Sequence, residues 1–420
     1  MNAVKTITGT ALVLATMAYA AAPASPVKAG GPAKAEKGVD VIVDDSFFYP
    51  GEPLASNEMR ISFMGSSFLP RIAQAANSVF VECGTNETFV FDCGAGVIAK
   101  YVAMGVAYSR MTKIFLTHLH ADHMSDLMFI YCFGPSVDRL TDLHVWGPTG
   151  PTNGESVVDL CGFTKAASKW HTESFSFLST GLTNGQDAYT IVPHECIYSN
   201  EGAVAYSSNG VQITHFPAIH DRDGAISYRL EWQGISMVFS GDSRPNYFML
   251  RNATNLDVLV HELTLSPEVW ATKNSGLHPG DPGYSNAVAT ATEIQDCSHT
   301  PAKAFGYICN QLSNAAPRLA VATHFQNNDD TIGQVLSDIR SWYSGPVSLA
   351  TDLMVVNISA DKSKPIRVRR AVVSDVAWYT RSASYPPGEV AQPRYTNNMM
   401  QLNAYLQSQI IPELLYTNTP

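Results

Sequence analysis

One short run of this chain places three imidazoles and a carboxylate within six positions, His118-Leu119-His120-Ala121-Asp122-His123. The residues before it, 113–117, are mostly apolar with β-branched and aromatic side chains, which is typical of a short buried strand. His118 and His120 are two apart on extended chain just past that strand, so their side chains point the same way. Asp122 and His123 open a helical pattern that runs to Phe133, and they can face a second centre beside the first. Because neutral imidazoles and a carboxylate suit zinc or a similar first-row ion, the run predicts a metal site.

This H-x-H-x-D-H run resembles the hallmark of the metallo-β-lactamase superfamily, and the resemblance extends from about Ile61 to Ile358. Within that superfamily the chain is most similar to the branch that contains ribonuclease Z and the zinc-dependent arylsulfatases. The resemblance implies an α/β (α+β) fold, the four-layer αβ/βα sandwich of the family. Such a sandwich is built from two pseudo-symmetric halves and carries two metal ions at one edge.

The resemblance also implies further metal ligands at the ends of apolar, strand-like segments. His220 follows such a segment, Asp242 lies in a Gly-Asp-Ser turn after another, and His324 ends a third. One metal would take His118, His120 and His220, the other Asp122, His123 and His324, with Asp242 bridging the two. Two divalent ions are therefore expected, zinc first, although iron and manganese accept the same ligands. His215 remains the alternative to His220, although it alternates with apolar Ile213 in a strand pattern.

Three more residues are expected to act around the metals. Asp92 ends a strand just before Gly94, where the family has an aspartate that holds the histidine loop by hydrogen bonds. His261, followed by Glu262, is expected to support the site rather than to react. His299 begins a helical pattern with Thr300 as its cap, and it could protonate a leaving group or stabilise developing charge. Asp122 and His299 are the predicted catalytic residues.

Length and composition agree with a large single domain that has an ample core, and the expected partner is a small-molecule substrate. Hydrophobic residues make up 45% of the 420 residues and charged residues only 15%, which is enough apolar material for a large core. The formal net charge of −10, with no block of Lys or Arg, disfavours a nucleic-acid partner, because such binders carry a basic face. A homodimer is possible on this sequence.

The first residues read as an export signal. Lys5 precedes an apolar run, and Ala18-Tyr19-Ala20 has the small-x-small form of a cleavage site. We therefore assign residues 1–20 to a signal peptide and 21–38 to a flexible linker, with a periplasmic or secreted mature protein. No later apolar stretch reaches the roughly 20 residues of a transmembrane helix, so no membrane association is expected after cleavage.

The rest of the chain is assigned to one hydrolase domain and an extension. Residues 39–360 form the metallo-β-lactamase-fold domain, 149–210 and 264–298 are insertions in it, and 361–420 pack on it as a C-terminal extension. In the second insertion, Trp270 and Tyr284 are predicted to stack on an aryl group of the substrate. Of the seven cysteines, Cys297 and Cys309 could form a disulfide.

The expected function is therefore an exported, dinuclear metal-dependent hydrolase of small aromatic, sulfate-type esters. Phosphodiesters as in ribonuclease Z, lactones, and hydrolytic dehalogenation remain alternatives, because the metals alone do not select the substrate. A non-catalytic metal-binding protein is the alternative of a different class.

Export predicts a processed N-terminus. Protein recovered from the periplasm or the medium should begin at Ala21, because cleavage follows Ala20 in the predicted signal. N-terminal sequencing measures this directly, and exported protein that still begins at Met1 would contradict it.

Overall fold

The computed structural model describes residues 41–43, 46–85, 87–149, 159–174, 188–221, 224–312 and 316–373. The predicted signal peptide and linker, parts of the first insertion, and the chain after residue 373 lie outside the described residues. No helix among the described residues is long and apolar enough to cross a membrane.

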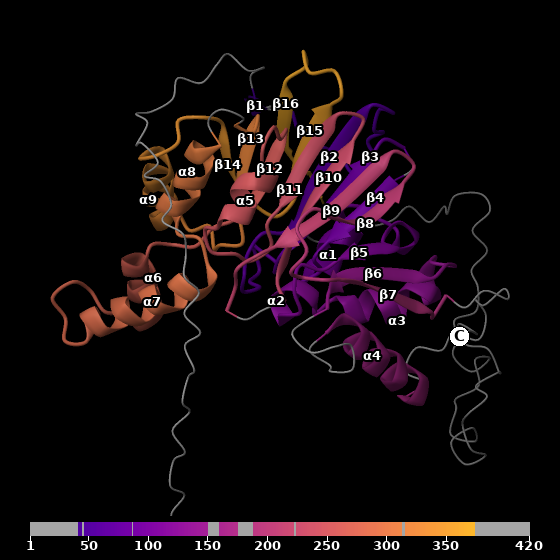
Figure 1. Ribbon diagram of the computed structural model, residues 1–420, viewed down its shortest axis with the longest axis horizontal. Coiled ribbons are helices and arrows are strands. Elements are labelled where there is room, and N and C mark those ends of the chain that lie inside the picture. The colour runs from indigo at the N-terminus through magenta and orange to yellow at the C-terminus, as the bar shows by residue number, and fades with distance from the viewer. Residues whose placement is uncertain are drawn as a thin grey trace, which may run out of the picture. The chain divides into compact units, whose positions relative to one another are not determined.

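Two mixed sheets make up the centre of the fold (Figure 1). The larger has the strand order β1-β16-β15-β2-β3-β4-β5-β6-β7, and the smaller β14-β13-β12-β11-β10-β9-β8. The strands of the larger sheet are β1 (Val41–Val43), β16 (Ile366–Arg370), β15 (Met354–Ser359), β2 (Glu58–Gly65), β3 (Ser78–Cys83), β4 (Glu87–Phe91), β5 (Lys113–Phe115), β6 (Leu143–Pro148) and β7 (Ile191–Cys196). Those of the smaller sheet are β14 (Val347–Leu349), β13 (Leu319–Thr323), β12 (Val258–Glu262), β11 (Ile235–Phe239), β10 (Ile226–Trp232), β9 (Val211–Pro217) and β8 (Ala203–Ser208).

Helices cover the outer faces of both sheets (Figure 1). The helices are α1 (Val97–Ala103), α2 (Ala121–Met124), α3 (Leu127–Val137), α4 (Leu160–Ser174), α5 (Tyr247–Asn252), α6 (Pro267–Ser275), α7 (Tyr284–Ser298), α8 (Ala302–Gln311) and α9 (Asp329–Arg340), with a 3₁₀ turn at Tyr108–Arg110. α1, α3 and α4 pack on the larger sheet, and α5, α8 and α9 pack on the smaller. Helices α6 and α7 lie side by side and extend away from the sheets (Figure 1).

Alternating side chains explain why both sheets are buried on two faces. On β3, Val79 and Val81 pack between the sheets, whereas Phe80 packs against the helices. On β11, Met237 packs between the sheets and Val238 against the helices of its own side. Successive residues of a strand point to opposite faces, so each strand contributes to an inter-sheet core and to a helix-facing core. These layers are the four-layer αβ/βα sandwich that the resemblance implies, and the predicted fold is confirmed.

The arrangement of parallel strands brings the functional loops to one edge. β4 to β7 run parallel in the larger sheet, and β11 to β14 run parallel in the smaller. Ligand sites in such sheets form beyond the carboxyl ends of the strands, where the loops meet. A backbone hydrogen bond of 2.9 Å from Ile226 N to Thr117 O joins the two sheets there.

Several local features differ from the sequence-based expectations. The larger sheet continues through β16, beyond the domain end expected at residue 360, because β16 pairs with both β1 and β15. Thr300 does not cap α8: its hydroxyl donates to Ser243 O instead, and Pro301 occupies the cap position. Cys309 is a free, buried thiol in the core behind α8, so the proposed disulfide with Cys297 is wrong.

Gly94 allows the loop that carries Asp122 to approach β4 closely. A Cβ on Gly94 would lie 2.0 Å from the backbone oxygen of Asp122, whereas a Cβ on Gly333 in α9 would meet nothing within 4 Å. The backbone of the loop that carries Asp122 therefore depends on the absence of a side chain at residue 94.

Gly94→Ala should displace the Asp122 loop. We expect it to lower the free energy of unfolding by about 1–3 kcal/mol, as overpacking does, and to lower metal content. Gly333→Ala is the matched control, and it should leave metal content unchanged while stabilising the helix by roughly 0.5–1 kcal/mol. Denaturant unfolding and metal analysis of both variants measure these effects. If Gly94→Ala had the stability and metal content of the wild type, the close approach at Gly94 would not be required.

Candidate metal centre

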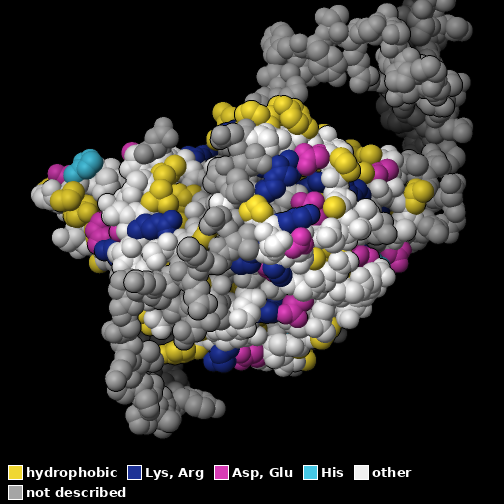
Figure 2. Space-filling view, turned by 90° about the horizontal axis from the view of Figure 1, so that it is seen from above, with side chains coloured by type: hydrophobic (Ala, Val, Ile, Leu, Met, Phe, Trp, Pro, Cys, Tyr) yellow, Lys and Arg dark blue, Asp and Glu magenta, His cyan; other side chains and the backbone are white. Residues whose placement is uncertain are grey.

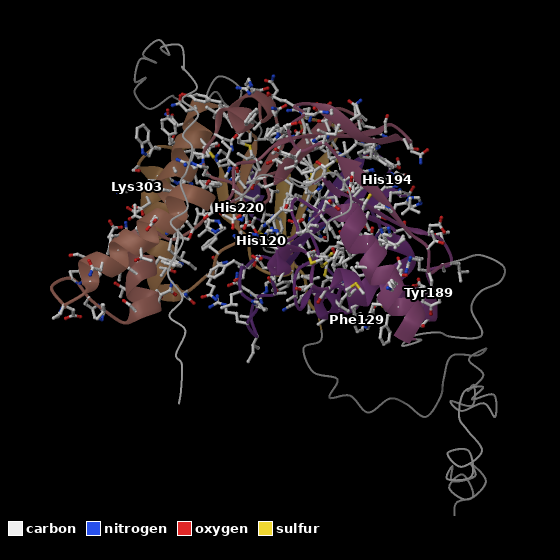
Figure 3. All side chains as sticks on the ribbon, turned by 60° about the horizontal axis from the view of Figure 1, so that its bottom comes forward. His120, Phe129, Tyr189, His194, His220 and Lys303 are labelled. Carbon is white, nitrogen blue, oxygen red and sulfur yellow. The ribbon has the colours of Figure 1, made fainter. Side chains whose placement is uncertain are left out.

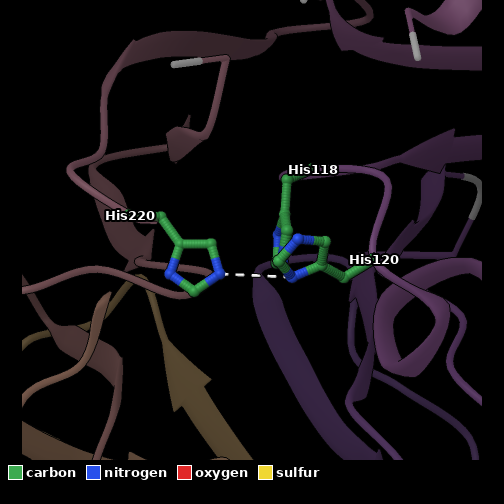
Figure 4. A group of neighbouring side chains, drawn as sticks. All are labelled: His118, His120 and His220. Atoms are coloured by element: carbon green, nitrogen blue, oxygen red, sulfur yellow. Dashed lines mark hydrogen bonds between the residues drawn. The ribbon is translucent and has the colours of Figure 1, made fainter. Parts of the chain in front are cut away.

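The structure brings the predicted metal ligands together in two adjacent groups. Ligand atoms within each group lie within 4.8 Å of one another. One group contains His118, His120 and His220, and the other contains Asp122, His123, Asp242 and His324. In Figure 3, His120 and His220 lie next to each other at the centre of the molecule, and Figure 4 shows the three imidazoles of the first group converging. This division is the one expected from the sequence.

Distances between facing nitrogens fit metal coordination. His120 Nδ1 and His220 Nε2 are 3.2 Å apart, and His123 Nε2 and His324 Nε2 are also 3.2 Å apart. A tetrahedral ion with metal–nitrogen bonds of about 2.0–2.1 Å holds its nitrogens roughly 3.3–3.4 Å apart. Each pair can therefore share one ion with little movement.

Asp242 lies between the two groups and faces both. Its Oδ1 is 3.1 Å from the Nε2 atoms of His123 and His324, whereas its Oδ2 is 3.9 Å from the Nε2 atoms of His118 and His220. The side chain comes from the loop after β11 and is 2% exposed. One oxygen per group is the arrangement that a bridging carboxylate requires.

Unpartnered polar atoms support the fit of a cation. His118 Nε2 is buried and makes no hydrogen bond, and the buried Asp242 Oδ1 faces only the imidazole nitrogens of His123 and His324. Such atoms are costly inside a protein unless they bind an ion or water, so their presence in one cluster points to a ligand.

The electrostatics of the cluster also favour positive charge. Burial opposes ionisation of Asp242, but the charges of His123 and His324 outweigh it and hold the pKa of that carboxyl well below its usual range. Burial likewise opposes protonation of His123, but Asp242 and Asp92 outweigh it and raise the pKa of that imidazole. The donor set, imidazoles with carboxylates, therefore suits divalent zinc, iron or manganese.

Asp92 holds the histidine loop in place. Its Oδ1 accepts from Thr117 N at 2.8 Å, and its Oδ2 lies 2.7 Å from His123 Nδ1. Because Nδ1–H of His123 donates to this carboxylate, Nε2 is the nitrogen that faces the cluster. Asp92 has φ 55° and His324 φ 69°, so both adopt the left-handed backbone conformation. That conformation turns the chain sharply after the strand, and asparagine, aspartate and histidine tolerate it better than most residues.

His299 lies beside the two groups and is paired with a buried carboxylate. Its Nδ1 is 3.0 Å from Glu262 Oε2, and Ser243 N donates to Glu262 Oε1 at 2.5 Å. Burial opposes protonation of His299, but the charge of Glu262 and its hydrogen bond outweigh burial and raise the pKa to about 9. His299 can therefore carry a proton at neutral pH next to the metal ligands.

His261 does not take part in this cluster. On β12 it shares its face with Leu259 and Leu263, which pack against the helices, whereas Glu262 points the other way. His261 Nδ1 lies 2.7 Å from Glu262 O, and the ring packs against Phe305. The supporting role expected for His261 belongs to its neighbour, and strand alternation was the signal that could have identified Glu262.

His215 is likewise a core histidine. It lies on β9 and is only 3% exposed, and burial lowers its pKa to about 4. His220, after the end of β9, donates from Nδ1 to Ser298 O at 3.0 Å, which leaves Nε2 for the cluster. The structure thus places His220, and not His215, with the other imidazoles.

A pocket of about 490 Å³ opens at the cluster. Its wall includes four of the histidines described above (His120, His220, His299 and His324) together with Asp122 and Asp242. The other lining residues are Phe68, Asp221, Glu293, Ile294 and Ser298. Sequence reasoning identified none of these five.

Trp270 and Tyr284, the predicted aryl-stacking residues, do not line the pocket. Trp270 packs against the helix-facing core of the smaller sheet. Tyr284 is the first residue of α7, and Ser298, which lines the pocket, is the last. With a rise of about 1.5 Å per residue, Tyr284 lies roughly 21 Å from Ser298 along the helix axis. The insertion does reach the site, but through the end of α7 rather than through its aromatic residues.

The sequence is similar to those of known proteins. A family model described as "Metallo-beta-lactamase superfamily" matches residues 71–131, which include the H-x-H-x-D-H run. The chain is 29% identical over 212 residues to a ribonuclease Z of Mycolicibacterium gilvum, covering 48% of this chain and 68% of that protein. It is 24% identical over 238 residues to a ribonuclease Z of Picrophilus torridus, covering 51% and 76%.

Two solved structures share the fold. The metallo-beta-lactamase fold protein YhfI from Bacillus subtilis has a TM-score of 0.50 at 16% identity, covering 72% of this chain and 100% of that one. A long form RNase Z from yeast has a TM-score of 0.50 at 18% identity, covering 76% and 44%. At such identities the likeness concerns the fold alone.

Ligand and core histidines should differ in their effect on metal content. Asp242→Ala and His220→Ala should each lower the metal bound per chain, because each removes a ligand atom from the cluster. His215→Ala, the control on the same segment as His220, should retain the wild-type metal content. Elemental analysis after dialysis measures this, with circular dichroism to verify folding. Normal metal content in a folded Asp242→Ala protein would remove the bridging assignment.

Proposed function

Because the chain belongs to the metallo-beta-lactamase superfamily, within the ribonuclease Z branch, we propose that its metal centre hydrolyses phosphodiester bonds. That the protein is a metal-dependent hydrolase follows from that membership and from the assembled ligand set. The phosphodiester is our own inference, and it rests mainly on the pair formed by Glu262 and His299.

The Glu262–His299 pair supplies a proton donor at the pocket wall. Nδ1 of His299 is engaged by the buried carboxylate, so Nε2 is the nitrogen left to act in the pocket that His299 lines. A general acid matters most when the leaving group is a poor one, because an alkoxide must be protonated as the bond breaks. Alcohol esters of phosphate have such leaving groups, whereas a phenolate departs more readily without a proton.

The roles of the other residues follow from their positions. Divalent ions held by the two groups would supply Lewis acidity and an activated water for attack on phosphorus. Asp242 would bridge the ions, which we propose to be two zinc ions, and Asp122 would complete the second group. Asp92 fixes the orientation of His123. His299 would give its proton to the departing oxygen, so that water and diester become a monoester and an alcohol.

Two other candidate substrates have less support. Aryl sulfates need the acid less, and the aromatic residues on which that expectation relied do not line the pocket. RNA is suggested by the names of the relatives, but the chain carries a net charge of −10, which disfavours a polyanionic substrate.

We also propose that the protein is exported. This proposal rests on the sequence of residues 1–20, which lie outside the described residues.

Leaving-group dependence tests the role of His299. His299→Ala should lower kcat about 10²–10⁴-fold for a diester that releases a primary alcohol, with metal content unchanged. For bis(4-nitrophenyl) phosphate, whose leaving group needs no proton, we expect a much smaller loss. Steady-state kinetics on both substrates measure the difference.

Glu262→Gln is the companion variant, because it keeps the shape of the side chain but removes the charge that holds the proton on His299. It should resemble His299→Ala on the alcohol-releasing diester. Equal losses on both substrates would exclude a proton donor, and a metal-loaded wild type that hydrolyses no phosphodiester would exclude the proposed function.

A further inference from the structure

Among the residues that the structure describes, the wall of the pocket has an apolar side chain on each of two separate segments and no Lys or Arg. Phe68 comes from the loop after β2, and Ile294 comes from the last turns of α7. Building on the proposed function, we propose that the substrate is a small phosphodiester with one apolar ester group, which sits between Phe68 and Ile294, and that polynucleotides are excluded.

Phe68 is next to the reacting centre. Its ring centroid lies 6.1 Å from that of His324, one of the proposed metal ligands, and 37% of the residue is exposed. An apolar group attached to a phosphate at the metals would therefore reach the Phe68 ring without a long spacer. Burying apolar surface against it is favourable in proportion to the area removed from water.

The loop that carries Phe68 is held on both sides. Before it, Ser66 donates to Asp352 Oδ1 at 2.9 Å, and its carbonyl accepts from Phe325 N at 3.1 Å. After it, the guanidinium of Arg71 donates to Asn327 O and to Asn328 Oδ1, each at 2.6 Å.

Polar anchors of this kind place the apolar ring at the pocket without burying it in the core. Because Ser66 and Arg71 are both hydrogen-bonded to the segment just after His324, the position of Phe68 is coupled to that of a proposed metal ligand. Phe68 is thus pre-organised as a binding surface, which lowers the entropy cost of binding a ligand.

Ile294 completes the opposite wall. It lies four residues before Ser298, so both share one face of α7, and Ser298 O accepts the Nδ1–H of His220. Ile294 and Ser298 both line the pocket, so the face of α7 that carries Ile294 is turned to the metal centre. Ile294 is 42% exposed, which leaves its side chain available to a ligand.

The charges at the mouth argue against a polyanion. Glu293 and Asp221 line the pocket, and Asp221 Oδ1 lies 3.7 Å from His120 Nε2 and 3.6 Å from His220 Nε2. Binding of nucleic acid depends on Lys and Arg that neutralise successive phosphates, and the pocket wall offers carboxylates instead. Elsewhere, on the face that Figure 2 shows from above, the described Lys and Arg side chains lie among Asp and Glu. A pocket of about 490 Å³ also matches a small molecule.

Chain-length dependence tests the proposal. With metal-loaded enzyme and 4-nitrophenyl alkyl phosphates bearing methyl, butyl or hexyl groups, kcat/KM should rise by roughly twofold to fourfold per methylene until the pocket is filled. Phe68→Ala and Ile294→Ala should each raise KM for the hexyl ester several-fold more than for the methyl ester. Phe68→Leu, which keeps an apolar side chain, should restore most of the preference.

Leu69→Ala is the matched control, because Leu69 neighbours Phe68 and is 56% exposed but does not line the pocket. It should leave the chain-length preference as in the wild type. A flat dependence in the wild type, or an equal loss in Leu69→Ala and Phe68→Ala, would overturn the proposal. Stronger inhibition by a short RNA oligonucleotide than by hexyl phosphate would also overturn it.

Binding of the monoesters separates this proposal from the proposed function. If no phosphodiester is hydrolysed, the proposed function fails, and calorimetry with hexyl phosphate and methyl phosphate still probes the pocket. Tighter binding of hexyl phosphate by the wild type, lost in Phe68→Ala, would support the apolar site. Equal binding of the two monoesters would refute it.

Discussion

Asp242 turns one oxygen toward His123 and His324 and the other toward His118 and His220. Two divalent cations side by side repel each other strongly in a buried site, and a shared anion offsets part of that repulsion. The carboxylate is almost completely buried, so water screens its charge poorly. The other proposed ligands surround this carboxylate, which lies between the two sets of imidazoles.

The fold holds Asp242 and its partners through hydrogen bonds between loops of both sheets. Asp92, after β4, binds the backbone of Thr117 and the ring of His123. Glu262, at the end of β12, binds the backbone of Ser243, the residue after Asp242, and also His299. Thr300 donates to Ser243 O, which ties the start of α8 to the same loop. Each half of the sandwich thus provides one buried carboxylate that orients a histidine and fixes a ligand-bearing loop.

Much of the candidate metal centre could be predicted because its residues lie in short, recognisable stretches of the sequence. The spacing of His118, His120 and His123 is local, and the family resemblance identified the remaining proposed ligands, each of which follows a strand-like segment. The four-layer fold followed from the same resemblance. Strand alternation could also have moved the supporting role from His261 to Glu262, because neighbouring residues of β12 point to opposite faces of the sheet.

The pocket wall could not be predicted in this way. Trp270 and Tyr284 were chosen for their chemistry, but α6 packs Trp270 onto the core and α7 carries Tyr284 far along its axis. Phe68 reaches the site because its loop is anchored to the segment around His324, more than two hundred residues away in the chain. By itself, the sequence determined the H-x-H-x-D-H run, through its local spacing, and, through the family resemblance, the sandwich and the order of the proposed ligands. Only the tertiary structure decided which apolar and acidic side chains surround the metals, because that depends on contacts between segments that have no local pattern in common.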